Sequence, residues 1–219
     1  MKTTLFLLAT ASALVSATPS AAAVIIDFNN VQTAENVLFS SSTSVASPTV
    51  TGQTNQTHVD VTFANILGLL KDASGQSSTT NAGGTLRGTT SVNIASGFTF
   101  TAAEFQLPGN PGNPPPPEAN SVFVEAFGLG GGVIGTATLA LDGNGENRIR
   151  IVGNAGEVFT GFRVTLSPQD AVTESMKQVR LGGVAAAVPE PATWAMMLGG
   201  FGLLGAAARR RHRTTVTFA

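Results

Sequence analysis

The residues best suited to acid–base chemistry are two glutamates, Glu104 and Glu125, which interrupt apolar runs of β type. A glycoside hydrolase needs two carboxylates facing each other across a cleft, and this pair is the first to consider. Twelve acidic residues are scattered between positions 24 and 187, so chance alone supplies such a pair. Each glutamate can equally face solvent or protect a sheet edge. We therefore predict that the protein is not an enzyme and keep a secreted hydrolase as the least favoured alternative.

Three oxygen-bearing side chains, Asp142, Asn144 and Glu146, lie at alternate positions and could suit Ca²⁺. An EF-hand loop needs Gly at its sixth position and Glu at its twelfth, where this chain has Asn147 and Gly153. The stretch also begins Asp-Gly-Asn-Gly, which is typical of a tight β-hairpin turn. We expect a plain turn and no cofactor, with calcium binding as the weaker alternative.

The remaining ligand and catalytic signals are weak. Glycines at 130, 132 and 135 spell G-x-G-x-x-G, but an apolar β-type run follows them and no helix is there to aim amides at a pyrophosphate. His58 is the single histidine between positions 24 and 187, and the chain has no cysteine. Metal catalysis needs several converging ligands, and cysteine catalysis and disulfides are excluded.

Sugar binding commonly uses exposed Trp or Tyr rings, and the segment from 24 to 187 contains neither. Its ten aromatic residues are all Phe, in patterns that predict core positions. Because these rings are missing, we keep a carbohydrate-binding module only as an alternative function. The same segment has twelve acidic and seven basic residues, a net charge of about −5, which argues against nucleic acid as a partner.

Short runs rich in β-formers, bounded by Gly, Asn, Asp and Pro, recur along residues 24–187 and predict an all-β fold. We expect a single β-sandwich, jelly-roll-like. Among the expected strands are 24–28, 98–107, 121–127, 133–141, 147–152 and 177–181. The proline-rich segment 108–117 cannot enter a central strand, because proline lacks the amide donor, so it is expected to be a loop. A linker between two small domains is the alternative.

The N-terminal residues 1–23 have the features of a secretory signal peptide. Lys2 gives a positive start, residues 5–15 are apolar, and Ala21 and Ala23 form an A-x-A cleavage site. We expect the secretion translocon and signal peptidase as partners and a mature chain that begins at Val24.

The C-terminal residues 188–213 have three parts in a fixed order: a Pro-Glu-Pro sequence, an uncharged run at about 192–208, and a basic cluster. The run predicts a transmembrane helix, slightly short for a bilayer, with its arginines on the cytoplasmic side. Residues 214–219 form a tail. The residues that define this pattern are Pro189, Glu190, Pro191, Trp194, Arg209, Arg210 and Arg211.

These residues resemble the PEP-CTERM sorting signal, in its PEPxxWA variant, of exported proteins of Gram-negative bacteria. The resemblance implies exosortase, a membrane-embedded cysteine protease or transpeptidase, as a partner, with cleavage near Pro-Glu-Pro after transient anchoring in the inner membrane. It also implies a final place at the cell surface or outside the cell. An ordinary C-terminal anchor is the alternative. We expect a non-enzymatic structural or adhesive role linked to exopolysaccharide or biofilm.

Overall fold

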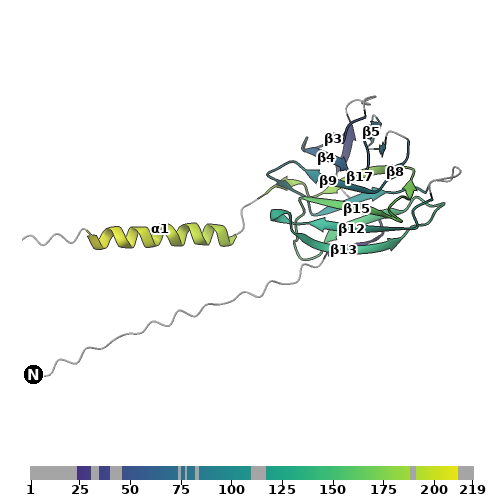
Figure 1. Cartoon of the computed structure of the whole chain (residues 1–219). Helices are drawn as coiled ribbons and strands as arrows, with labels where there is room; N and C mark the ends of the chain where they lie inside the picture. The colour runs from purple at the N-terminus through teal and green to yellow at the C-terminus, as the bar shows by residue number, and fades with distance from the viewer. Residues whose placement is uncertain are drawn as a thin grey trace, which may run out of the picture.

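The computed structural model combines a β-rich part with one α-helix, α1 (Pro191–Arg211) (Figure 1). The structure describes residues 24–30, 35–39, 46–73, 75–76, 78–81, 84–109, 117–187 and 191–211. The predicted signal peptide with Ala21 and Ala23, the sorting residues Pro189 and Glu190, and the tail 214–219 lie outside these ranges.

Many of the strands coincide with the predicted runs of β-formers, although the structure also has strands at 75–76, 78–81 and 185–186, which the sequence did not indicate. They are β1 (Val24–Phe28), β2 (Glu35–Phe39), β3 (Thr49–Thr54), β4 (Asp60–Asn65), β5 (Leu70–Ala73), β6 (Gly75–Gln76), β7 (Ser78–Asn81), β8 (Leu86–Arg87), β9 (Thr89–Ile94), β10 (Phe98–Thr99), β11 (Ala102–Gln106), β12 (Ser121–Phe127), β13 (Val133–Ala140), β14 (Arg148–Gly153), β15 (Gly161–Ser167), β16 (Val172–Thr173), β17 (Met176–Gly182) and β18 (Ala185–Ala186). The all-β prediction is therefore confirmed for the described residues between 24 and 187.

Most strands belong to one large antiparallel sheet. Its order is β1-β14-β11-β17-β2-β3-β4-β9-β15-β12-β13, and two small sheets pair β10 with β18 and β8 with β16. Strands from both sides of the proline-rich segment are neighbours, because β11 pairs with β14 and β17. This order does not confirm the predicted jelly-roll topology. Residues 110–116 of the proline-rich segment lie outside the described ranges.

The large sheet folds over so that its two halves enclose one core. Phe105 on β11 stacks on Phe162 on β15, with ring centroids 4.9 Å apart, although five strands separate β11 from β15 in the sheet order. The two end strands also meet, since a Cβ added to Gly135 on β13 would lie 2.6 Å from Cβ of Val24 on β1. Glycine at this position permits the close approach of the two strands.

Alternation along the strands separates the core from the outer faces. Ile149 and Ile151 on β14 are fully buried in the core, whereas Arg148 and Arg150 lie on the opposite face of the strand. The Asp-Gly-Asn-Gly stretch does form a turn, but the predicted hairpin is wrong. Strand β13 pairs with β12, whereas β14 pairs with β1 and β11, so the turn links the two halves of the sheet.

Helix α1 includes the predicted helical run at 192–208. In the part of the chain that the structure describes, no helix combines the length and the apolar character needed to cross a membrane, so the predicted transmembrane helix is not supported. The helix contains four glycines, at 199, 200, 202 and 205, and ends in arginines, which lowers its apolar content per turn.

Candidate functional site

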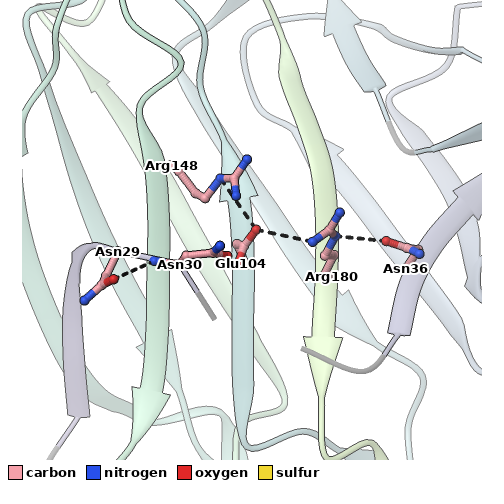
Figure 2. Close-up of polar contacts among 6 residues, drawn as sticks. All are labelled: Asn29, Asn30, Asn36, Glu104, Arg148 and Arg180. Atoms are coloured by element: carbon pink, nitrogen blue, oxygen red, sulfur yellow. Dashed lines mark hydrogen bonds and ion pairs between the residues drawn. The ribbon is translucent and has the colours of Figure 1, made fainter. Parts of the chain in front are cut away.

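A buried carboxylate, Glu104, lies at the centre of a polar cluster on the outer face of β11. Its neighbours Ala103 and Phe105 point into the core, so Glu104 points to the other side of the sheet. Its side chain has no exposed area, and its Oε1 lies 3.7 Å from Nε of Arg148 and 3.8 Å from Nη1 of Arg180. A buried charge is costly unless it is paired, and the two guanidinium groups supply that pairing (Figure 2).

Strand register aligns this cluster across five strands. Glu104 lies opposite Arg150 on β14 and Arg180 on β17, and these arginines lie opposite Asp27 on β1 and Asn36 on β2. Arg150 donates to both carboxylate oxygens of Asp27, at 2.7 and 2.5 Å, and Arg180 donates to Oδ1 of Asn36 at 3.0 Å. The hydrogen bond to Asp27 is the main cause of the raised pKa of Arg150. These contacts across neighbouring strands fix the side chains of Arg150 and Arg180 on the outer face of the sheet.

A bulge beside Glu104 brings in two glutamines. The register between β11 and β17 shifts between Glu104 and Gln106, which marks a β-bulge or irregularity within the expected strand 98–107. Gln178 on β17 has φ of 51°, in the left-handed region that is uncommon for residues other than glycine. With the Gln106 amide oxygen turned toward Arg148, it accepts hydrogen bonds from Nε at 3.1 Å and Nη2 at 2.5 Å. Arg148 is thereby fixed by two buried polar side chains.

Glu125, the other glutamate of the proposed catalytic pair, lies on the opposite layer. Val124 and Ala126 on β12 are buried in the core, so Glu125 faces outward from the half of the sheet that contains β12. It forms a two-point ion pair with Arg163 on β15, at 2.6 and 3.0 Å, which raises the pKa of Arg163 chiefly through this hydrogen bonding. The two glutamates project from opposite outer faces, so they do not converge in a cleft.

An open hollow of about 450 Å³ lies where β1 and β13 end and β14 begins. Phe28, Asn29 and Arg148 line it together with the turn that carries Asp142 and Glu146. Phe28 is 45% exposed, and Phe123 on β12 is also exposed, so the prediction that all ten phenylalanines lie in the core is wrong. Phe28 is the last residue of β1 and lies at the edge of the core. The residues next to it in the sequence did not indicate that its ring would be exposed.

The weak calcium candidate lies in that same turn. Asp142 accepts the Asn144 amide on its Oδ1 at 3.1 Å, and the Asn147 side chain bonds both the amide and the carbonyl of Asp142, at 2.7 and 2.8 Å. Within the described ranges, no group of three or more His, Cys, Asp or Glu side chains is placed to hold a metal. The turn geometry thus accounts for the spacing of Asp142 and Asn144.

Two further sequence signals have structural explanations. The glycines at 130, 132 and 135 lie in and after a short 3₁₀ turn, Leu129–Gly131, and β13 follows directly. The helix that a dinucleotide site needs is therefore not there. His58, at the start of the segment leading into β4, has φ of 55° and donates its amide hydrogen to the carbonyl of Thr54 at 3.1 Å.

The sorting residues that the structure describes lie on α1. Pro191 begins the helix, and Arg209, Arg210 and Arg211 form its last turn. Trp194 is 49% exposed, and the large apolar side chains at 196, 197, 198, 201, 203 and 204 are exposed as well. The β-rich part ends just before, where β18 pairs with β10 and the Ala187 amide donates to the Gly97 carbonyl at 2.8 Å.

Comparison with known proteins identifies one segment of the chain. The family model of the PEP-CTERM protein-sorting motif matches residues 187–211, which confirms the resemblance found from the sequence. No curated protein matches the chain. No solved structure matches it either.

Proposed function

From the PEP-CTERM motif, which marks the chain as an exported protein targeted to exosortase and processed at the membrane, we propose a structural or adhesive role outside the cell. Signal peptidase removes residues 1–23 after translocation, and exosortase cuts near Pro189. The β-rich part then acts at the cell surface or in the extracellular matrix, in association with exopolysaccharide or biofilm, without catalysing a reaction.

The observation that carries this proposal is the position of the motif relative to the last strand. Ala187 still bonds to the β-rich part, and α1 begins at Pro191 with its described apolar side chains exposed. A cut near Pro189 would therefore remove the motif without exposing core. A segment that can be lost at no cost to the fold suits a sorting signal.

A non-enzymatic role is supported by the state of the two glutamates that the sequence offered for catalysis. Glu104 is enclosed by Arg148 and Arg180, and Glu125 is held by Arg163. A general acid or nucleophile needs access to substrate, and these carboxylates are engaged in ion pairs on opposite layers.

Intact-mass analysis of the protein from the medium and envelope of its host tests the proposal. We expect a species that runs from Val24 to near Pro189, and we expect the uncut chain in a host that lacks exosortase. Replacing Glu190 with Ala should also leave the C-terminal segment in place, whereas Thr193→Ser, inside the motif at a variable position, should not. Retention of everything through Ala219 in the normal host would overturn the processing claim.

Binding to the purified exopolysaccharide of the host tests the role. Co-sedimentation of the processed protein with the polysaccharide is the expected result. Hydrolysis of that polysaccharide by the purified protein would overturn the non-enzymatic assignment.

A further inference from the structure

We propose that the hollow beside Phe28 is a binding site for a neutral hexose-based saccharide. This inference rests on the proposed association with exopolysaccharide and names the site and the ligand class. The hollow lies between the ends of β1 and β13 and the turn before β14, and its volume of about 450 Å³ is in the range of small-ligand sites.

The hollow is lined by an exposed aromatic residue, Phe28. Val24 and Ile26 on β1 pack against the core, whereas Phe28, on the same side of the strand, is 45% exposed where the core ends. A flat apolar surface of this kind can stack on the C–H face of a sugar ring, and a Phe left exposed has hydrophobic area still to bury. The sequence offered no Trp or Tyr for this purpose, and Phe28 supplies the apolar part of their function.

Polar side chains line the hollow together with this ring. Asn29 is exposed and uses its Oδ1 to accept the Asn30 amide at 2.8 Å, so its NH₂ group is not engaged in that hydrogen bond (Figure 2). The carboxylates of Asp142 and Glu146 are exposed acceptors, and Arg148 is a donor. Sugar hydroxyl groups both donate and accept hydrogen bonds, so a mixed rim of this composition suits them.

Hydrogen bonds hold the turn and the Arg148 side chain of the hollow in place. The Asn147 side chain bonds the backbone of Asp142 and also donates to the Leu107 carbonyl at 2.9 Å, which ties the turn to the segment after β11. The Gly109 amide donates to the Gly145 carbonyl at 2.9 Å. Gln106 fixes the guanidinium group of Arg148. Polar groups that are held in place before binding lose little conformational entropy when a ligand arrives.

The charge of the rim selects the kind of saccharide. Asp142 and Glu146 carry two negative charges, and Arg148 carries one positive charge that already lies near Glu104. A uronic acid would meet a net negative rim, whereas a neutral hexose would meet acceptors for its hydroxyl groups. The geometry therefore favours a neutral saccharide.

The test uses the protein isolated from its host and the purified host exopolysaccharide, with affinity measured by electrophoresis in polysaccharide-containing gels. We expect Phe28→Ala to weaken binding about fivefold to tenfold, the loss that one aromatic contact commonly causes. Phe28→Leu keeps apolar bulk without the flat ring and should bind nearly as weakly while unfolding at the same temperature as the native protein. The matched control is Phe123→Ala, a 38% exposed Phe on β12 outside the hollow, which should bind as the native protein does.

Each outcome separates the site from the proposed role. If the native protein does not bind the polysaccharide, the proposed association and this site both fail. If it binds and Phe28→Ala and Phe123→Ala bind equally well, the association stands and the site is overturned. Reduction of the carboxyl groups of the polysaccharide to alcohols should leave binding intact. Loss of binding after that reduction would overturn the neutral-saccharide assignment.

Discussion

Phe105 and Phe162 stack almost in parallel, with an interplanar angle of 8°, and this contact joins the two halves of the folded sheet. Both rings are fully buried. The contact connects residues that are distant both along the chain and along the sheet order, so it closes the core rather than extending a strand pair.

Replacing Phe105 with Ala should therefore destabilise the protein severely. The cavity left between β11 and β15 should lower the free energy of unfolding by about 3 to 5 kcal/mol, the usual range for Phe→Ala in a core. Urea denaturation, monitored by circular dichroism, measures this change in the free energy of unfolding. The control Phe123→Ala removes an exposed ring and should cost less than about 1 kcal/mol. Equal losses for both variants would contradict the central role of the contact.

Replacing Glu104 with Gln should cost more than the same change at Glu125. Both carboxylates pair with arginine, but Glu104 is fully buried between two guanidinium groups, which are then left without their counter-charge. We expect a loss of about 1 to 3 kcal/mol at Glu104, because both arginines retain some exposure to water, and less than about 1 kcal/mol at Glu125. Urea denaturation of the two variants measures both losses in the free energy of unfolding. A larger loss for Glu125→Gln than for Glu104→Gln would contradict this prediction.

A methyl group at position 135 should separate the end strands. In Gly135→Ala the new Cβ would meet Val24 at 2.6 Å, so β1 must move away from β13, at a cost of about 1 to 3 kcal/mol. Gly132→Ala is the matched control, since no atom lies within 4 Å of its added Cβ. Hydrogen exchange of the β1 amides should speed up in the first variant alone. Unchanged exchange in Gly135→Ala would show that the approach of the strands is not tight.

A chain that ends at Ala187 should be as stable as the longer chain. Because the described apolar side chains of α1 are exposed, its removal takes no packing from the β-rich part, and the free energy of unfolding should change by less than about 0.5 kcal/mol. A chain that ends at Gly183 is the control, because it also loses β18 and its pairing with β10. A marked decrease in the free energy of unfolding of the chain that ends at Ala187 would show that α1 packs against the β-rich part.

Calcium should leave the thermal unfolding midpoint unchanged. Oδ1 of Asp142 already accepts a hydrogen bond from the Asn144 amide, so few carboxylate oxygens in the turn are available to coordinate an ion. Differential scanning calorimetry in millimolar CaCl₂ and in EDTA should give the same midpoint. A calcium-dependent rise that Asp142→Asn abolishes would instead establish a calcium site in the turn.

Part of the fold could be predicted because its signals are local. Strands β1 and β12 have the predicted bounds, since alternation of apolar and polar residues shows directly in a short stretch. The burial of Ile149 and Ile151 follows from the same alternation within the expected strand 147–152. The sorting motif is a linear pattern that needs no fold to be recognised, so the sequence alone identified it.

The partners of the strands could not be predicted in this way. The turn chemistry at 142–145 indicated a hairpin, but β13 and β14 pair with other strands, because a turn sequence sets the local backbone and not the strand that lies alongside. The role of Glu104 was likewise hidden. The sequence showed Glu104 only as an acidic residue within an apolar run. Its burial between Arg148 on β14 and Arg180 on β17 became apparent only from the structure.

The sequence by itself determined the strand-rich character of the chain and its C-terminal sorting signal, since these depend on residues close together in the chain. The tertiary structure alone decided that Glu104 and Glu125 face opposite sides, and that Phe28, Asn29 and Arg148 line one hollow with the 142–147 turn. The reason is physical: β-pairing is non-local, and strand β1 binds β14 more than a hundred residues later in the chain. Side chains from such distant strands meet only after the whole sheet has closed.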